Sequence, residues 1–254
     1  MGEGAPSGVL SKALAVLQAF TVEDTTLGFA EVQRRTGLAK GTLHRTLGDL
    51  VAGRLLDRVE GRYRLSSLVF ELGMRASVER GLLEVATPFL EDLYERTHEL
   101  VHLGIREGVE VVYVAKMGGH QQADSPSRLG GRMPLHSTAL GKVLLAHAPA
   151  DVRESVLRGP LERRTPRTLT NVDVLTRQLS DVVAKGVAFE YEESAVGLVC
   201  VASGIFGAAD EILGAVSVTG PVHRFQPARH ANSVRAAAAG ITATLGRREE
   251  MLRR

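Results

Sequence analysis

The chain has 254 residues, of which 44% are hydrophobic, and a formal net charge of +2. This length accommodates two modest domains, and the composition excludes a disordered chain. The first residues, MGEGAPSG, lack the apolar run of a secretory signal, and no stretch reaches the length of a membrane span. One cysteine excludes an internal disulfide, so we expect a cytoplasmic protein.

Two helices are predicted first. Residues 29–36 predict a short helix with its apolar residues inward and two basic residues outward, Arg34 and Arg35. Before it, residues 9–20 predict a helix whose apolar side faces a core: Val9, Leu10, Ala13, Leu14, Val16, Leu17 and Phe20.

Residues 37–50, GLAKGTLHRTLGDL, predict the turn and second helix of a helix-turn-helix, the unit that places one helix in a DNA major groove. Leu43, Leu47 and Leu50 recur at spacings of four and three residues, so they form one buried stripe. A helix that buries its leucines and displays donors in its first turns can contact base edges and phosphates. Burial of the leucines turns the polar residues outward: Lys40, Thr42, His44, Arg45 and Asp49.

A basic hairpin is predicted directly after this helix. Residues 55–58 and 62–65 have the pattern of two short strands around a glycine-containing turn. Together with the three helices they predict a winged helix-turn-helix, in which the hairpin offers basic residues to the phosphate backbone: Arg58, Arg62 and Arg64. The alternative is an ordinary small helical domain with a solvated hairpin.

The positive charge is concentrated in this part of the chain. Between residues 26 and 65 there are eight basic and four acidic residues. Such an excess predicts affinity for phosphates that weakens as the salt concentration rises. We expect Thr42 and Arg45 to contact bases, and the other DNA contacts to come from Arg34, Arg35, Lys40, His44, Thr46, Arg58 and Arg62.

A helical connection is predicted after the hairpin, because residues 66–80 keep helical spacing. The expected division is a DNA-binding domain over 1–66, a linker helix over 67–81 and a second domain over 82–254. Three roles are open for such a linker helix: it transmits a tilt from one domain to the other, it forms part of a dimer interface, or it only packs against its neighbours. The sequence pattern does not distinguish these alternatives.

The second domain is predicted to be an antiparallel sheet with helices packed against it. Its strand topology does not follow from the pattern. Strands are predicted over 100–105, 109–114, 187–189, 198–205 and 212–219, a polar loop over 121–131, and helices over 82–97, 137–148, 151–157, 171–185 and 227–245.

Five blocks then stand in a fixed order: GLAKGTLHR at 37–45, RMPLHSTALGK at 132–142, the threonine-containing segment 165–170, EESAVGLVCVA at 192–202 and AVSVTGP at 215–221. In this order they resemble the isocitrate lyase regulator (IclR) family of bacterial transcription factors over almost the whole chain. The resemblance implies an α+β protein with a winged helix-turn-helix, a linker helix and a GAF-like effector domain. It also implies dimers or tetramers on palindromic operators, small carboxylic or aromatic effectors, and repression more often than activation.

The resemblance also implies an effector site on the second domain. Ser217 and Thr219 lie two residues apart on a predicted strand, so both hydroxyls face one side. With helix N-terminal amides near residues 137–139, they can hold a carboxylate. The effector residues carried over by position are Leu129, Ala139, Leu140, Glu190, Cys200, Ser217 and Thr219.

Two positions depart from the family's pattern. Ser203-Gly204 stands where Ala-Pro is common, and Glu190 stands where Asp is common. The longer carboxylate either narrows the pocket or favours a ligand with a cation or a hydroxyl.

Cys200 is a pocket wall, a buried filler or a nucleophile. His136 either has a structural or capping role or binds a ligand or a metal. The other histidines lack the spacing of metal ligands, and no phosphate-binding loop is present, so we expect no metal and no cofactor. The favoured function is a ligand-responsive transcriptional regulator. The alternatives are an activator of the same family, an enzyme that uses Cys200 with His136 beside an accessory DNA-binding arm, and a constitutive architectural DNA binder.

Overall fold

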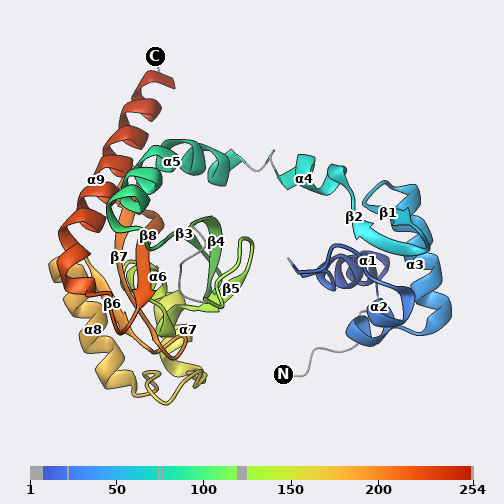
Figure 1. Ribbon diagram of the computed structural model, residues 1–254, viewed down its shortest axis with the longest axis horizontal. Helices are drawn as coiled ribbons and strands as arrows, with labels where there is room; N and C mark the ends of the chain where they lie inside the picture. The colour runs from blue at the N-terminus through green and yellow to red at the C-terminus, as the bar shows by residue number, and fades with distance from the viewer. Residues whose placement is uncertain (1–7, 22, 74, 76, 119–124, 253–254) are drawn as a thin grey trace. The chain divides into compact units, whose positions relative to one another are not determined.

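The structure of the protein is a computed structural model that describes residues 8–252 except 22, 74, 76 and 119–124. The chain folds into two compact units, residues 1–80 and 81–254 (Figure 1). Each unit has its own hydrophobic core. None of the helices that the structure describes combines the length and the hydrophobicity that a bilayer crossing requires.

The first unit is a three-helix head followed by a two-stranded hairpin. Gly37 ends the second helix in the left-handed conformation, with a φ of 67°, and so allows the sharp turn into the third helix. The hairpin is antiparallel, and Leu27 adds an isolated bridge to Tyr63. The elements are α1 (Val9–Gln18), α2 (Phe29–Thr36), α3 (Lys40–Ala52), β1 (Leu56–Val59), β2 (Arg62–Leu65) and α4 (Ser67–Gly73).

The leucine stripe of α3 forms the centre of the core of the head, as the sequence predicts. Leu43, Leu47 and Leu50 are buried together with Val32 and Leu56. The apolar side of α1 is different. The prediction that all its apolar residues face the core is wrong, because three of them are exposed, at 82% for Val9, 72% for Leu10 and 46% for Leu14.

Where the sequence predicts one linker helix, the structure has two elements. Helix α4 ends at Gly73, and α5 (Ser77–Thr97) begins four residues later and continues into the second unit. Helix α4 buries none of its residues, and Phe70 is 70% exposed.

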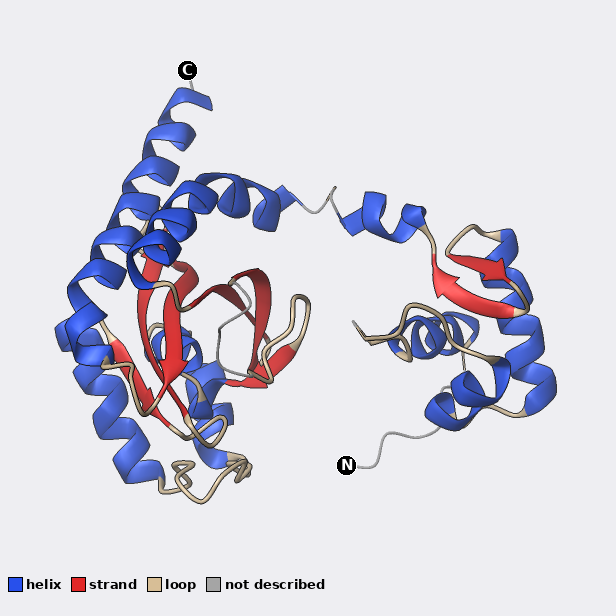
Figure 2. Cartoon of the chain, viewed as in Figure 1, coloured by secondary structure: helices blue, strands red, loops and turns tan. Residues whose placement is uncertain are grey.

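Within the described part of the second unit, six strands form one antiparallel sheet in the order β5-β4-β3-β8-β7-β6 (Figure 2). The hairpin of β3 and β4 and the later strands confirm the predicted strands to within a few residues, and β5 was not predicted. The elements after α5 are β3 (Leu100–Glu107), β4 (Glu110–Met117), β5 (Arg132–Pro134), the 3-10 turn η1 (Leu135–Ser137), α6 (Ala139–Ala146), α7 (Ala150–Arg158), α8 (Val172–Lys185), β6 (Ala188–Tyr191), β7 (Leu198–Phe206), β8 (Ile212–Pro221) and α9 (Pro227–Leu252).

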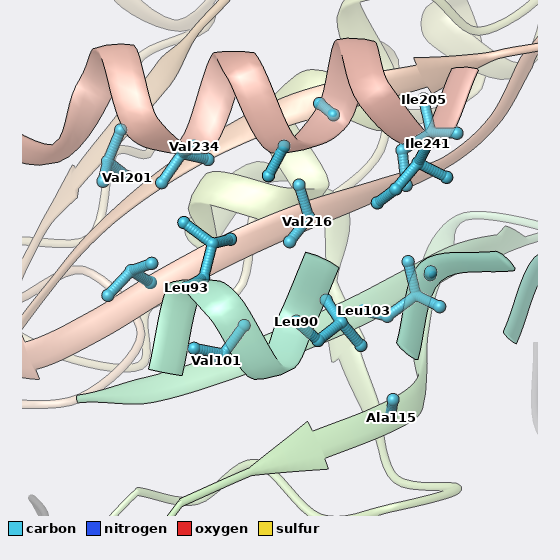
Figure 3. Close-up of a cluster of buried hydrophobic side chains, with 14 of the residues drawn as sticks. Leu90, Leu93, Val101, Leu103, Ala115, Val201, Ile205, Val216, Val234 and Ile241 are labelled. Carbon is cyan, nitrogen blue, oxygen red and sulfur yellow. The ribbon is translucent and has the colours of Figure 1, made fainter. Parts of the chain in front are cut away.

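The sheet separates two layers of helices because successive side chains of a strand point to opposite faces. On one face, residues of α5 and α9 pack on valines and leucines of the central strands (Figure 3). On the other face, α6 and α8 pack on small residues, among them Ala202 and Ala215. The face under α6 also carries polar side chains, and these form the site described below. The predicted class is confirmed: an α+β chain with a winged helix-turn-helix head and an antiparallel sheet domain.

Candidate functional site

Helix α3 presents a polar face to solvent. Lys40, His44 and Arg45 are exposed, and Thr42 is half-buried. Among the described residues, no carboxylate lies within ion-pair distance of Lys40 or Arg45. The leucines on the opposite side of α3 pack in the core and hold the helix in place. The side chains of Lys40 and Arg45 are therefore presented to solvent from a rigid helix.

One residue of α3 that is predicted to contact DNA, Thr46, is largely covered by the head itself. Thr46 is buried because its position falls on the same side of the helix as Leu43 and Leu50. Its side chain is therefore less accessible than those of Lys40, His44 and Arg45. The periodicity that identified the leucine stripe places Thr46 at the edge of that stripe, where a short side chain is readily covered.

The two arginines of α2 are held within the head. Arg35 bonds Asp24, the Ala19 carbonyl oxygen and, through Nε at 2.6 Å, Glu31. Arg34 bonds both oxygens of the Glu31 carboxylate. The hydrogen bonds from Arg34 and then Arg35 lower the pKa of Glu31 to about 2. Arg35 thus ties α2 to the end of α1, while Arg34 is 72% exposed beside its acidic partner.

The hairpin arginines also have internal contacts. Arg62 donates from Nε to the Thr26 hydroxyl at 2.8 Å and from Nη2 to the Thr26 carbonyl oxygen at 3.0 Å. Arg58 lies 6.0 Å from the centroid of the Tyr63 ring, and Arg64 pairs with Asp57 at 3.0 Å. Arg62 therefore fixes the hairpin to the segment before α2, which positions the wing beside α3.

The second unit contains a small cavity between the sheet and the start of α6. Strands β3, β8 and β7 form its floor, and its free space is about 20 Å³, room for about one water molecule. Eight of its fourteen lining residues carry a hydroxyl or an imidazole group. The lining residues are His102, Tyr113, Ser125, Pro126, Ser127, Met133, Thr138, Ala139, Leu140, Ser194, Leu198, Cys200, Ser217 and Thr219.

The N-terminus of α6 forms one wall of this cavity. The Thr138 hydroxyl accepts a hydrogen bond from the Gly141 amide at 2.9 Å, which caps the helix. The amides of Ala139 and Leu140 lie in the first turn, where a helix provides no partner and favours an anion. Gly141 allows the close approach of α6 to η1, since a Cβ there would lie 2.2 Å from the Leu135 carbonyl oxygen.

The floor of the cavity carries hydroxyl and thiol groups in register. Cys200 pairs with Thr219 across β7 and β8, and their Sγ and Oγ1 atoms are 3.0 Å apart. Burial, followed by the charge of Glu190, raises the pKa of the Cys200 thiol well above its usual value. A thiol with a raised pKa is a poor nucleophile. His136, the proposed catalytic partner, bonds the Glu162 carbonyl oxygen at 3.0 Å and does not line the cavity.

The loop before β7 is held by a buried ionic cluster. Glu190 accepts hydrogen bonds from the Glu193 and Ser194 amides. Lys142 is 1% exposed, and its Nζ lies 2.6 Å from the Glu193 carboxylate and 2.8 Å from the Gln178 amide oxygen. Burial raises the pKa of Glu193 more than its ion pair with Lys142 lowers it.

Two threonines of the segment 165–170 complete this support. Thr165 donates to the Glu192 carbonyl oxygen at 2.6 Å, and Thr168 donates to the Glu193 carbonyl oxygen at 2.7 Å. The segment singled out in the sequence therefore positions the loop that carries Ser194, one of the cavity walls.

Two residues carried over as effector contacts lie elsewhere. Leu129 is 56% exposed and outside the cavity, because the turn at Gly130 and Gly131 bonds the backbone of Tyr113 and leaves Leu129 in solvent. Glu190 is fully buried, but its carboxylate binds loop amides and does not line the cavity. The other five residues carried over lie on the cavity wall.

The departure at Ser203 and Gly204 lies inside β7 and not in the cavity. The Ser203 hydroxyl donates to the Gly186 carbonyl oxygen at 2.8 Å, at the end of α8. A Cβ on Gly204 would lie 2.9 Å from the Phe206 ring, so the glycine leaves room for that ring.

Sequence reasoning missed several residues of the cavity. His102, Tyr113 and Ser127 line it, and Lys142 supports it from behind. Alternation along 100–105 places His102 on one face of its strand, but which face meets α6 depends on the strand order. No signal in the sequence alone supplies that order.

A helix-turn-helix head joined to a sheet domain with a buried polar cavity defines a DNA-binding regulator of transcription. The IclR helix-turn-helix domain family matches residues 9–60, and the family of the bacterial transcriptional regulator IclR C-terminal domain matches residues 74–243. The chain belongs to the IclR family of bacterial transcriptional regulators, and it is therefore a transcriptional regulator and not an enzyme.

Individual relatives agree with this family. The chain is 32% identical to the HTH-type transcriptional regulator XynR of Escherichia coli (strain K12), over 88% of this chain and 90% of XynR. It is 28% identical to the transcriptional repressor AllR of Klebsiella pneumoniae, over 93% of this chain and 89% of AllR. A crystal structure of an IclR homolog from Microbacterium hydrocarbonoxydans complexed with 4-hydroxybenzoate has 30% identity and a TM-score of 0.88, covering 94% of this chain and 99% of that one.

Proposed function

We propose that the head binds operator DNA through α3 and that the second unit binds a small carboxylic or aromatic acid in the cavity beside α6. One observation carries this proposal: each of the two separately folded units has its own polar surface. One is an exposed cationic helix on a rigid core, and the other is a buried hydroxyl-lined cavity at a helix N-terminus. The two surfaces have chemistry suited to two different ligands.

In the head, Thr42 and Arg45 contact base edges, and Lys40, His44 and Arg58 contact phosphates. Arg35 and Arg62 act mainly as positioning residues, since their guanidinium groups bind Asp24 and Thr26. Arg34 adds positive charge at the edge of this surface.

Replacing Arg45 by Ala is expected to weaken binding to the specific operator by about 1–3 kcal/mol, because a bidentate contact to guanine is lost. The operator is first selected from a random duplex library with the full-length protein, and affinities are then measured by gel-shift titration at fixed salt. Arg158→Ala, which removes an exposed arginine of α7, is the control and should bind as the unchanged protein does. Equal operator affinity for Arg45→Ala would remove this residue from the interface.

In the second unit, the carboxylate of the ligand meets the amides at the start of α6 and the hydroxyls of Ser217 and Thr219. The relative complexed with 4-hydroxybenzoate supports an aromatic acid as one such ligand. Because the cavity has room for about one water, binding requires its apolar walls, Met133, Leu140 and Leu198, to move apart. Binding then changes operator affinity only through a difference in ligand affinity between two states of the protein.

Replacing Ser217 by Ala together with Thr219 by Val is expected to abolish ligand-induced stabilisation while leaving operator binding unchanged. A ligand at a hundred times its Kd stabilises the folded state by about 2.7 kcal/mol, which a melting experiment resolves. The measurement is a melting-temperature screen against carboxylates, aromatics and sugars, with Thr176→Val on the exposed side of α8 as the control. A stabilising acid that acts equally on the double variant would place the binding site elsewhere.

The protein acts as a homodimer, or a tetramer of paired dimers, on a palindromic operator. The exposed apolar residues Val9, Leu10 and Leu14 of α1 support this, and so do Phe70 and Leu72 of α4, since a second copy of the chain would cover such side chains. Operators selected in the experiment above should then be inverted repeats. Repression is the proposed sign of control, supported by the repressor AllR among the relatives.

A further inference from the structure

Gly41 lies in the first turn of α3, on the side of the helix that points away from the core of the head. Because an α-helix turns by about 100° per residue, Gly41, Arg45 and Gly48 share one side, opposite the buried Leu43 and Leu47. All three are exposed. Within residues 41–48, all of which the structure describes, Arg45 is therefore the one long side chain on the outermost side of α3.

No packing within the head accounts for glycine at position 41. A Cβ there would meet no atom within 4 Å. The backbone is not in the left-handed conformation that favours glycine, and alanine is more favourable than glycine in a helix. What glycine does provide is a stretch of helix surface without a side chain, one turn before Arg45.

The neighbouring side chains border this bare surface and do not cover it. Lys40 and His44 lie on one flank, where the His44 ring is 6.5 Å from the Phe29 ring between centroids. Thr42 lies on the other flank. Its side chain is short, so its hydroxyl and methyl groups reach a base edge only if the backbone of the first turn lies close to the bases.

The dimensions of DNA make this first turn sensitive to a single added methyl group. The major groove is about 12 Å wide, and a helix with its side chains is about 10–12 Å across, so the fit is tight. In a helix-turn-helix the N-terminal residues of the second helix contact the base edges. Gly41 lies in that part of α3, whereas Gly48 lies roughly 10 Å further along the helix axis.

We propose that Gly41 is a positioning residue for operator recognition. Its bare backbone lets the first turn of α3 lie against the base edges in the major groove. This close approach brings Thr42 within reach of a base and sets the depth from which Arg45 meets guanine. The inference rests on the proposed function and adds to it a residue that acts through the absence of a side chain.

The test measures DNA binding by full-length Gly41→Ala in gel-shift titrations at fixed salt. The operator selected from the random library should bind roughly 10- to 100-fold more weakly, because the added methyl group holds the first turn away from the bases. A non-operator duplex of equal length should bind as before, since that binding depends on phosphate contacts. The unfolding temperature should be unchanged or slightly higher, because the methyl group meets no atom of the head.

Two further variants and a chemical probe separate close approach from other roles. Gly48→Ala adds the same methyl group on the same side of α3 and should bind the operator as tightly as the unchanged protein. Gly41→Leu should lose more affinity than Gly41→Ala, whereas a need for backbone flexibility would give equal losses. Dimethyl sulfate methylates guanine N7 in the major groove, so it should modify operator guanines under bound Gly41→Ala that the unchanged protein protects.

Equal operator affinity for Gly41→Ala and the unchanged protein would overturn this inference, and so would equal losses for Gly41→Ala and Gly41→Leu. An equally large loss on the non-operator duplex would overturn it as well, since the effect would then lie in phosphate contacts. The Arg45→Ala measurement decides the proposed function separately. If Arg45→Ala weakens operator binding and Gly41→Ala does not, only the role of Gly41 is wrong.

Discussion

Replacing Lys142 by Met is expected to lower the free energy of unfolding of the second unit by about 3–5 kcal/mol at neutral pH, the usual cost of leaving a buried charge without its partner. Lys142 Nζ bonds the Glu193 carboxylate, the Gln178 amide oxygen and the Phe189 carbonyl oxygen. Methionine fills the same space and removes all three donors. The remaining Glu193 charge is 6% exposed and has no other cation bonded to it among the described residues.

The size of this loss should depend on pH in a defined direction. The pKa of Glu193 is already raised by burial, and removal of Lys142 raises it further above the value of about 4.3 found in unfolded chains. A carboxyl whose folded pKa is raised contributes stability below the unfolded pKa and loses it as the pH rises through the folded pKa. The variant should therefore be closest to the unchanged protein near pH 4 and furthest from it near pH 8.

Scanning calorimetry of the full-length protein at several pH values measures this effect. The matched control is Lys185→Met, which removes an exposed pair with Asp181 and should cost under about 1 kcal/mol. The double variant Lys142→Met, Glu193→Gln removes both charges and should recover most of the loss. A loss for Lys142→Met that is independent of pH would contradict the ionic explanation.

Replacing Leu47 by Ala is expected to destabilise the head by about 2–5 kcal/mol and to abolish operator binding. Leu47 is 1% exposed and lies on the core side of α3, between Leu43 and Leu50. The head is small, and domains of this size have little stability to spare. The second unit has separate cores, so its ligand-induced stabilisation should persist in this variant.

The control is Gly48→Ala, one residue further along α3. A Cβ on Gly48 meets no atom within 4 Å, and alanine favours a helix interior more than glycine does, so the head should become slightly more stable. If the core explanation holds, calorimetry shows changes of opposite sign in the free energy of unfolding of the head for the two variants. Gel shifts then show lost operator binding for Leu47→Ala only. Operator binding by Leu47→Ala at full affinity would show that α3 does not depend on this leucine.

The sequence alone determined the head and the family. The leucines at positions 43, 47 and 50 recur at helical spacing, and that spacing dictates which side of α3 is buried before any tertiary contact is known. The hairpin after α3 follows from short strand patterns around a glycine turn for the same reason, since these are local properties of the chain. The five sequence segments that resemble the family, in their order along the chain, indicated the family.

Tertiary structure decided the composition of the cavity. Ser217 and Thr219 share a face because of strand alternation, but only the order β3-β8-β7 brings His102 beside them. Burial of Thr46, exposure of Leu129 and exposure of the outer side of α1 also depend on what packs against each residue. Pairing between distant strands is non-local, so one chain pattern is compatible with several strand orders, and the neighbours of a polar side chain follow from the order that the whole domain adopts.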